Sequence, residues 1–407
     1  MIKSLPVLFA CITSSVFGQG PVVTSWIINP GSETGYNGIL SNVLEVNYTT
    51  TDVYVSCTCV PGYDIGPWVG NPNTPANQDF TFRVTRTPQQ NTGTLVNAGL
   101  GHIGVWRNGV SIFNAKDGMS YNNQGIWNRD ALVFEGSSFD ACLGHPAPNG
   151  EYHHHVSPNC LYDHTNDELH SDLIGFAFDG FPVYGAFGFT DPDGSGGIAR
   201  MRSGYQLRSI TERTSLPNGT MLMAGQYGPA IAGQYPLGAF IEDYEFVEAS
   251  GDLDVHNGRF CVTPDYPDGI YAYFVTLDEQ LDPAYPYTIG PTYYGTVQSG
   301  NTGPQSGHNT VPGNAVLFDP STAIAQLVNG SALTVFPVPS DDELNIRMDG
   351  AALRSVELFD AQGRSVAMHG VSGTTAAVEI SALAPGGYSA RIISTDGSIV
   401  VHAFVKR

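Results

Sequence analysis

Turn-forming residues interrupt this chain at short intervals, and this pattern constrains the fold more than any other feature. The 407 residues include 48 glycines and 27 prolines, and residues 21–295 consist of strand-like apolar runs separated by Pro, Gly and Asn. Glycine and proline disfavour helix interiors, whereas tyrosine and phenylalanine, at 20 each, favour strands. Charged residues make up only 14% of the chain, which argues against many amphipathic helices. The sequence therefore predicts a mainly β protein.

The N-terminus has the features of a secretory signal. Lys3 supplies a positive charge, residues 5–12 are apolar, and residues 16–18 form a small-residue cleavage site. We expect residues 1–18 to be a signal peptide. No run in the chain reaches the roughly 20 apolar residues that a membrane-spanning helix needs, so no transmembrane segment is expected.

The balance of charges argues against one class of partner. Seventeen basic residues stand against 38 acidic ones, and the formal net charge at pH 7 is −21. Binding to nucleic acid depends on clustered lysine and arginine, so we expect no nucleic-acid partner. The acidity suits attraction of cations, although solubility alone would also explain it.

Three regimes of composition follow the signal and predict two folded domains joined by a linker. Residues 21–295 form the first domain. Residues 296–332 begin with TVQSGNTGPQSGHNTVPGN, which lacks apolar periodicity, and are expected to be a linker. Residues 333–407 alternate short apolar runs with turn sequences, which predicts a small Ig-like β-sandwich.

The end of the chain resembles a known family of export signals. VFPVPSDDELNI begins the last domain, VELFDAQGRSV follows, and LAPGGYSARIISTDGSIVVHAFVKR ends it. In this order they resemble the type A C-terminal sorting domain of the type IX secretion system, except that Val338 stands where the family's opening Pro-Asn-Pro element has asparagine. The resemblance implies the secretion machinery as a partner, export across an outer membrane, removal of this domain, and a secreted or outer-cell-surface location.

A cysteine at each end encloses the histidine-rich stretch CLGHPAPNGEYHHHVSPNC, residues 142–160. We expect Cys142 and Cys160 to form a disulfide, which is appropriate in an exported protein and is worth about 3 kcal/mol for a loop of this size. After the turn at residues 149–150, EYHHHV has strand character. Side chains alternate across a strand, so His153 and His155 are expected on one face, with His154 on the other.

These histidines are candidate metal ligands. His153 and His155 share a face at a separation that one cation can bridge, and His145 could be brought back by the disulfide-closed turn as a third ligand. His256, beside two aspartates in a distant segment, is the fourth candidate. Imidazole suits zinc or copper. Calcium is less well supported, because DPDGSG at residues 191–196 lacks the bidentate glutamate of an EF-hand. The alternative is that the histidines pack as half-buried aromatic rings that donate to backbone carbonyls.

The first domain also resembles a family, the YHYH proteins, named for a Tyr-His-Tyr-His tetrad. The matching tetrad is residues 152–155, with His154 in place of the second tyrosine, and the similarity extends over most of residues 50–295. The resemblance implies a disulfide-stapled, β-rich domain. It implies no activity.

Three functions remain open on the sequence alone. The first is binding of a metal cation by the histidine cluster. The second is surface adhesion or recognition of a glycan or protein, with Trp68, Trp106 and Trp127 as candidate stacking platforms. The third is metal-dependent hydrolysis, so whether the protein is an enzyme is unresolved.

Three further cysteines remain once the signal is removed. Cys57 and Cys59 lie two apart on an expected strand and are poorly placed to bond each other. One of them is expected to pair with Cys261, and a reactive or metal-binding thiol is the alternative.

Overall fold

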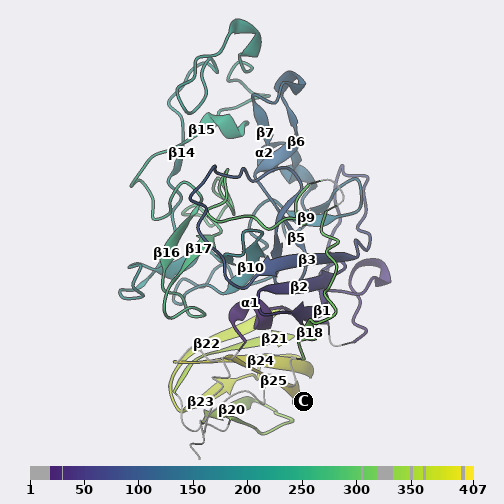
Figure 1. Ribbon diagram of the computed structural model, residues 1–407. Helices are drawn as coiled ribbons and strands as arrows, with labels where there is room; N and C mark the ends of the chain where they lie inside the picture. The colour runs from purple at the N-terminus through teal and green to yellow at the C-terminus, as the bar shows by residue number, and fades with distance from the viewer. Residues whose placement is uncertain are drawn as a thin grey trace, which may run out of the picture.

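The computed structural model describes residues 19–29, 31–303, 306–319, 333–348, 352–360, 364–395 and 399–407. Residues 1–18, the expected signal peptide, and residues 320–332 of the expected linker lie outside these ranges. The described parts are mainly β, as the sequence predicts, with short helices that include α1 (Pro21–Thr24) and α2 (Ala131–Glu135) (Figure 1).

The first domain is built on two sheets. The smaller sheet has the order β18 (Val316–Leu317), β1 (Val43–Tyr48), β2 (Asp52–Cys57) and β3 (Phe80–Thr85). The larger sheet has the order β16 (Gly258–Cys261), β17 (Ile270–Phe274), β11 (Pro182–Tyr184), β10 (Leu173–Ala177), β4 (His102–Trp106), β5 (Ser111–Phe113), β9 (Tyr152–His154) and β8 (His145–Pro146).

Both faces of the larger sheet are buried at its centre. In β10, Phe176 packs into a core shared with the smaller sheet, whereas Ile174 and Ala177 pack into a second core on the opposite face. This explains why β4 and β10 are buried along their whole length instead of alternating between buried and exposed residues. The turn between β10 and β11 is the Asp-Gly pair at residues 179–180, where Gly180 takes a φ of +90°.

Three two-stranded ribbons extend from these sheets. They are β6 (Lys116–Ser120) with β7 (Asn128–Asp130), β12 (Phe187–Phe189) with β13 (Ile198–Arg200), and β14 (Tyr205–Leu207) with β15 (Tyr244–Phe246).

The C-terminal domain is the β-sandwich that the sequence predicts. One sheet has the order β19 (Leu333–Phe336), β20 (Glu343–Met348) and β23 (Thr375–Glu379). The other has the order β22 (Ser365–Gly373), β21 (Leu353–Asp360), β24 (Gly386–Ser394) and β25 (Ile399–Lys406). Alternate residues of both sheets fill one core, for example Ile346, Leu358 and Ile392.

Part of the segment expected to be a linker packs onto the first domain. Strand β18 pairs antiparallel with β1, and Asn309 donates its side-chain amide to the carbonyl of Thr81 at 2.9 Å. These contacts hold residues 306–319 along the edges of the smaller sheet.

The expected disulfide to Cys261 is wrong. Cys57, Cys59 and Cys261 are all buried free thiols. The Cys57 thiol donates to the carbonyl of Gly109 and the Cys59 thiol to that of Tyr152, each at 3.1 Å. Both thiols therefore have acceptors in the core. Burial also raises the pKa of Cys57 to about 12, so this thiol is not the reactive group considered as an alternative.

Candidate metal centre

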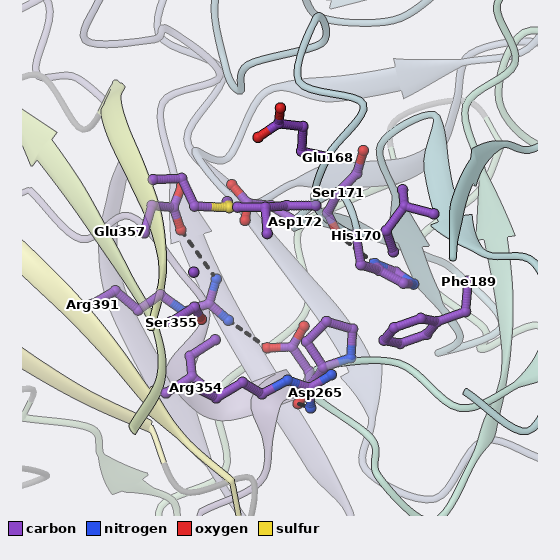
Figure 2. Close-up of a pocket in the computed structure, with 16 residues that line it drawn as sticks. Glu168, His170, Ser171, Asp172, Phe189, Asp265, Arg354, Ser355, Glu357 and Arg391 are labelled. Carbon is purple, nitrogen blue, oxygen red and sulfur yellow. Dashed lines mark hydrogen bonds and ion pairs between the residues drawn. The ribbon is translucent and has the colours of Figure 1, made fainter. Parts of the chain in front are cut away.

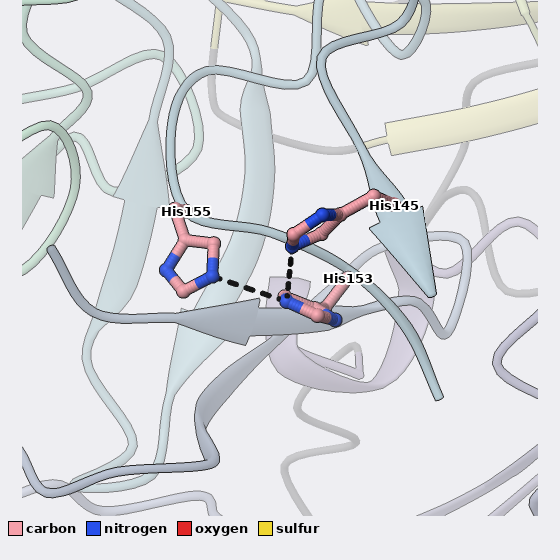
Figure 3. Close-up of side chains that lie close together, drawn as sticks. All are labelled: His145, His153 and His155. Atoms are coloured by element: carbon pink, nitrogen blue, oxygen red, sulfur yellow. Dashed lines mark hydrogen bonds between the residues drawn. The ribbon is translucent and has the colours of Figure 1, made fainter. Parts of the chain in front are cut away.

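Strands β8 and β9 bring three histidines to one point (Figure 3). The two strands pair antiparallel, and His145 lies directly opposite His153 in their register. Directly opposed residues project from the same face of a sheet, and His155 follows two positions after His153 on that face. The backbone therefore places all three rings together.

A disulfide and a tight turn fold β8 back onto β9. Cys142 and Cys160 are bonded, as expected, with their Cα atoms 5.1 Å apart. The chain reverses at Gly150, whose φ of +83° favours glycine, and the N–H of Ala147 donates to the carbonyl of Glu151 at 2.9 Å. The loop thus returns His145 to the strand that carries the other two histidines.

The opposite face of β9 anchors the strand. The Tyr152 hydroxyl donates to the Asp140 carboxylate at 3.0 Å, and that carboxylate also accepts the backbone N–H groups of Cys142 and Gly144. His154 lies on this face, fully buried, and is excluded from the cluster by the strand's alternation.

The three Nε2 atoms converge. His153 Nε2 lies 3.1 Å from Nε2 of His145 and 3.1 Å from Nε2 of His155. The three potential ligand atoms all lie within 4.8 Å of one another. Two nitrogens bound to one tetrahedral zinc at the usual bond length lie about 3.3 Å apart, so both short separations suit a shared ion. The rings are 3–5% exposed.

Hydrogen bonds at Nδ1 determine which nitrogen of each ring carries its proton. His153 Nδ1 lies 3.0 Å from the carbonyl of Glu151, and His155 Nδ1 lies 2.6 Å from that of Asn114. A carbonyl only accepts, so both Nδ1 atoms donate. His145 Nδ1 lies 2.8 Å from the hydroxyl of Ser138, whose own proton goes to a backbone carbonyl. It therefore donates as well, and a ring that carries only this one proton leaves its Nε2 atom free to act as a ligand.

Burial keeps His145 and His153 from taking up a second proton. It lowers the pKa of His145 to about 4, with the neighbouring His155 adding to the effect. Burial, together with His155 and His145, also holds the pKa of His153 well below its usual range. Near neutral pH these two rings present lone pairs toward the same point, and a bound cation would relieve their repulsion.

Glu135, which sequence reasoning did not identify, completes the cluster. Its Oε2 lies 3.3 Å from Nε2 of His155 and 3.6 Å from Nε2 of His145. It is the last residue of α2, a helix that begins where Asp130 accepts the N–H groups of Leu132 and Val133. Burial opposes ionisation, but the adjacent His155 and His145 rings outweigh it and lower the pKa of Glu135. No local pattern links it to the histidines.

Aromatic side chains surround the cluster. Phe113 stacks on the ring of His153 with centroids 3.8 Å apart, and Phe139 contacts both His145 and His155. The side chain of Glu135 is 34% exposed, whereas those of His145 and His155 are 6% and 3% exposed. Glu135 is therefore the member of the cluster that faces water.

The other residues considered from the sequence lie elsewhere. The structure does not bring His256 to the cluster. Its Nδ1 lies instead 3.0 Å from the carbonyl of Thr292. Trp106 and Trp127 are at most 1% exposed, so they belong to the core and cannot act as stacking platforms. Trp68 is half-buried and donates its indole N–H to Asp140 at 3.1 Å. In the aspartate-rich turn, Asp193 accepts from the N–H and hydroxyl of Ser195.

Comparison with known proteins identifies both domains. The YHYH protein family model matches residues 81–285, and the secretion system C-terminal sorting domain model matches residues 334–406. The sorting domain indicates type IX export and a secreted or cell-surface location. Among the helices of the described residues, none is long and apolar enough to cross a membrane.

Comparison of the chain with individual proteins adds little to these family matches. No curated protein matches the chain. One solved structure, PorZ, an essential surface component of the type IX secretion system of Porphyromonas gingivalis, is 11% identical. The alignment covers 89% of this chain and 59% of PorZ, with a TM-score of 0.16, which is too low to support an argument. The family models, together with the tetrad on β9, show that this chain belongs to the YHYH protein family and ends in a secretion sorting domain.

Proposed function

We propose that this exported protein binds one divalent transition-metal ion, zinc or copper, through His145, His153 and His155. One observation carries the proposal: the three Nδ1 atoms all donate to fixed acceptors, while His153 Nε2 lies 3.1 Å from each of the other two Nε2 atoms. Metal-binding histidines commonly donate their second ring N–H in this way, because it orients the ring and raises its basicity.

The donor set favours a borderline transition metal over calcium or magnesium. Imidazole nitrogen suits zinc and copper, whereas calcium and magnesium prefer sets made of oxygen. Glu135 supplies the fourth ligand, or instead hydrogen-bonds to a water that occupies the fourth position. A closed set of four protein ligands is typical of structural zinc, and an open position is typical of catalytic zinc.

Elemental analysis of the purified, untagged protein tests the proposal. After exposure to zinc or copper and removal of excess metal, the wild type is expected to hold one equivalent of ion. The variant His153→Ala/His155→Ala is expected to hold none, because it removes two of the three nitrogen ligands. His256→Ala is the matched control and is expected to keep the ion. Equal metal content in the wild type and the double variant would refute the site.

Metal-dependent hydrolysis is the second candidate, and it rests on Glu135 being the solvent-facing member of the cluster. A metal-bound water next to a carboxylate is a hydrolytic arrangement. The variant Glu135→Gln distinguishes a site that only binds metal from one that also catalyses hydrolysis. If the site is catalytic, the variant keeps its ion and loses ester or amide hydrolysis over a panel of simple substrates. If neither protein hydrolyses any substrate on the panel, this candidate loses its support.

A further inference from the structure

The sorting domain packs against the YHYH domain through a face that its own strands would otherwise expose. In β21, Val356 and Leu358 belong to the core of the sorting domain, so the alternate residues Glu357 and Phe359 point outward. Both are nevertheless buried, at 3% and 7% exposure. Arg391, the cross-strand neighbour of Glu357 on β24, is likewise outward-facing and 5% exposed. The YHYH domain is what covers them.

Charged side chains of both domains meet at this face. Figure 2 shows Arg391 of the sorting domain between Glu357 and Asp265, and Asp265 belongs to the YHYH domain. Arg107 of the YHYH domain reaches the other way, 3.3 Å from Oε1 of Glu357 and 3.6 Å from Oδ2 of Asp172. These side chains are 1–8% exposed. Each domain thus places an arginine against a carboxylate of the other.

The buried charges balance only if one carboxyl group is neutral. Burial and the adjacent Glu357 raise the pKa of Asp172 well above its usual range, which favours the neutral form of this carboxyl group. Two arginines then face two carboxylates, Asp265 and Glu357. Removing one member of such a set leaves an uncompensated charge in a dry environment, which is strongly unfavourable.

A cation–π contact between the domains and further hydrogen bonds support the same face. The Arg107 guanidinium lies 4.8 Å from the centre of the Phe359 ring, and the Tyr184 hydroxyl donates to Asp265 at 3.0 Å. Arg354 donates to the carbonyl of Pro264 at 3.4 Å. A cavity of about 230 Å³ lies beside these contacts and is lined by both domains. The contacts pair opposite charges across the two domains, unlike those of a domain that is only tethered.

We propose that the sorting domain is a docked subunit, which stays bound to the YHYH domain after the chain is cut between them. A protease that cuts within residues 320–332 breaks the covalent connection and leaves the ion pairs of Arg107 and Arg391 in place. Release then requires something that displaces this face, in addition to cleavage. This inference is independent of the metal site.

The test uses the full chain with a site-specific protease sequence introduced within residues 321–331. After complete cleavage at micromolar concentration, size-exclusion chromatography is expected to give one peak that contains both fragments. Two separate peaks would overturn the proposal. Mass photometry of the co-eluting peak is expected to give the mass of one YHYH fragment with one sorting domain, and a doubled mass would show exchange between copies instead.

Variants then test whether the ion pairs hold the subunit. Arg391→Met and Asp265→Asn each remove one charge from opposite sides of the same pair, and each is expected to weaken association of the cleaved fragments at least 100-fold. Arg364→Met is the matched control, because the Arg364 side chain is 50% exposed and its ion pair with Asp360 lies within the sorting domain. Circular dichroism before cleavage checks that each variant is folded. Wild-type association in both folded variants would refute the role of the ion pairs.

Discussion

Among the three proposed ligands, His145 is the one whose orientation depends most on a single side chain. The other two rings donate to backbone carbonyls, whereas His145 donates to the hydroxyl of Ser138. That hydroxyl serves as an acceptor only because its own proton is directed to the carbonyl of Glu135 at 2.8 Å. The serine therefore sets both the proton position and the angle of the ring.

Ser138→Ala is expected to lower metal affinity about 10- to 100-fold without changing the number of ions bound at saturation, since such outer partners have effects of this size. Competition against a chromogenic chelator measures the metal affinity. Ser137→Ala is the control, because Ser137 is exposed and the contact with His145 is made by the next residue, Ser138. If both variants lose affinity equally, the serine acts through the local backbone and not through the ring.

At the scale of elements, the loop that joins β8 to β9 determines whether the site forms. These strands are short, and β9 is the element that connects β8 to the rest of the larger sheet. The disulfide closes a sequence separation of 18 residues around them. Restricting the unfolded chain in this way is worth about 3 kcal/mol in the loop-entropy account.

The variant Cys142→Ala/Cys160→Ala is expected to lose about 3 kcal/mol of unfolding free energy and to bind metal more weakly, because β8 carries the proposed ligand His145. Chemical denaturation and metal titration measure the two effects. Treating the wild type with a reductant should reproduce both losses, and the same reductant should leave the variant unchanged. A variant with wild-type metal affinity would show that β8 docks without the disulfide.

At the scale of the whole molecule, hydrogen bonds to the Asp179 side chain join segments that are distant in the sequence. Its carboxylate accepts the Tyr273 hydroxyl at 2.6 Å and the N–H groups of Gly295 and Phe181 at 2.8 and 3.2 Å. Burial raises the pKa of Asp179 to about 6, and these hydrogen bonds limit the rise. The folded protein therefore binds this proton more tightly than the unfolded chain does.

The raised pKa of Asp179 predicts how the stability of the protein depends on pH. Because the folded-state pKa is above the unfolded one, the contribution is fully present below about pH 4 and is lost as pH rises through about 6, by about 3 kcal/mol. Asp179→Asn is expected to reduce the slope of unfolding free energy against pH by this amount, measured in the presence of a chelator; Asp130 and Glu242, whose pKa values burial raises to about 7, contribute the rest. Asp193→Asn is the control, since hydrogen bonds from Ser195 lower the pKa of that exposed group and place its effect below this range. An unchanged slope in Asp179→Asn would contradict the assignment.

Local periodicity allowed much of this protein to be predicted. Alternation along residues 152–155 predicted that His153 and His155 share one face, and the structure places them together. The strand pattern after residue 333 predicted the C-terminal sandwich. All of these depend on interactions between residues that are close in the chain, where the side-chain period and turn preferences apply.

By itself, then, the sequence determined the β class, the Cys142–Cys160 bridge, the shared face of two histidines and the export signal. Tertiary packing alone decided that Glu135 joins the cluster and that His256 does not. It also left Cys261 unpaired and seated the sorting domain on buried ion pairs. The physical reason is that a strand's period states which way a side chain points, whereas only the assembled layers determine what it meets there.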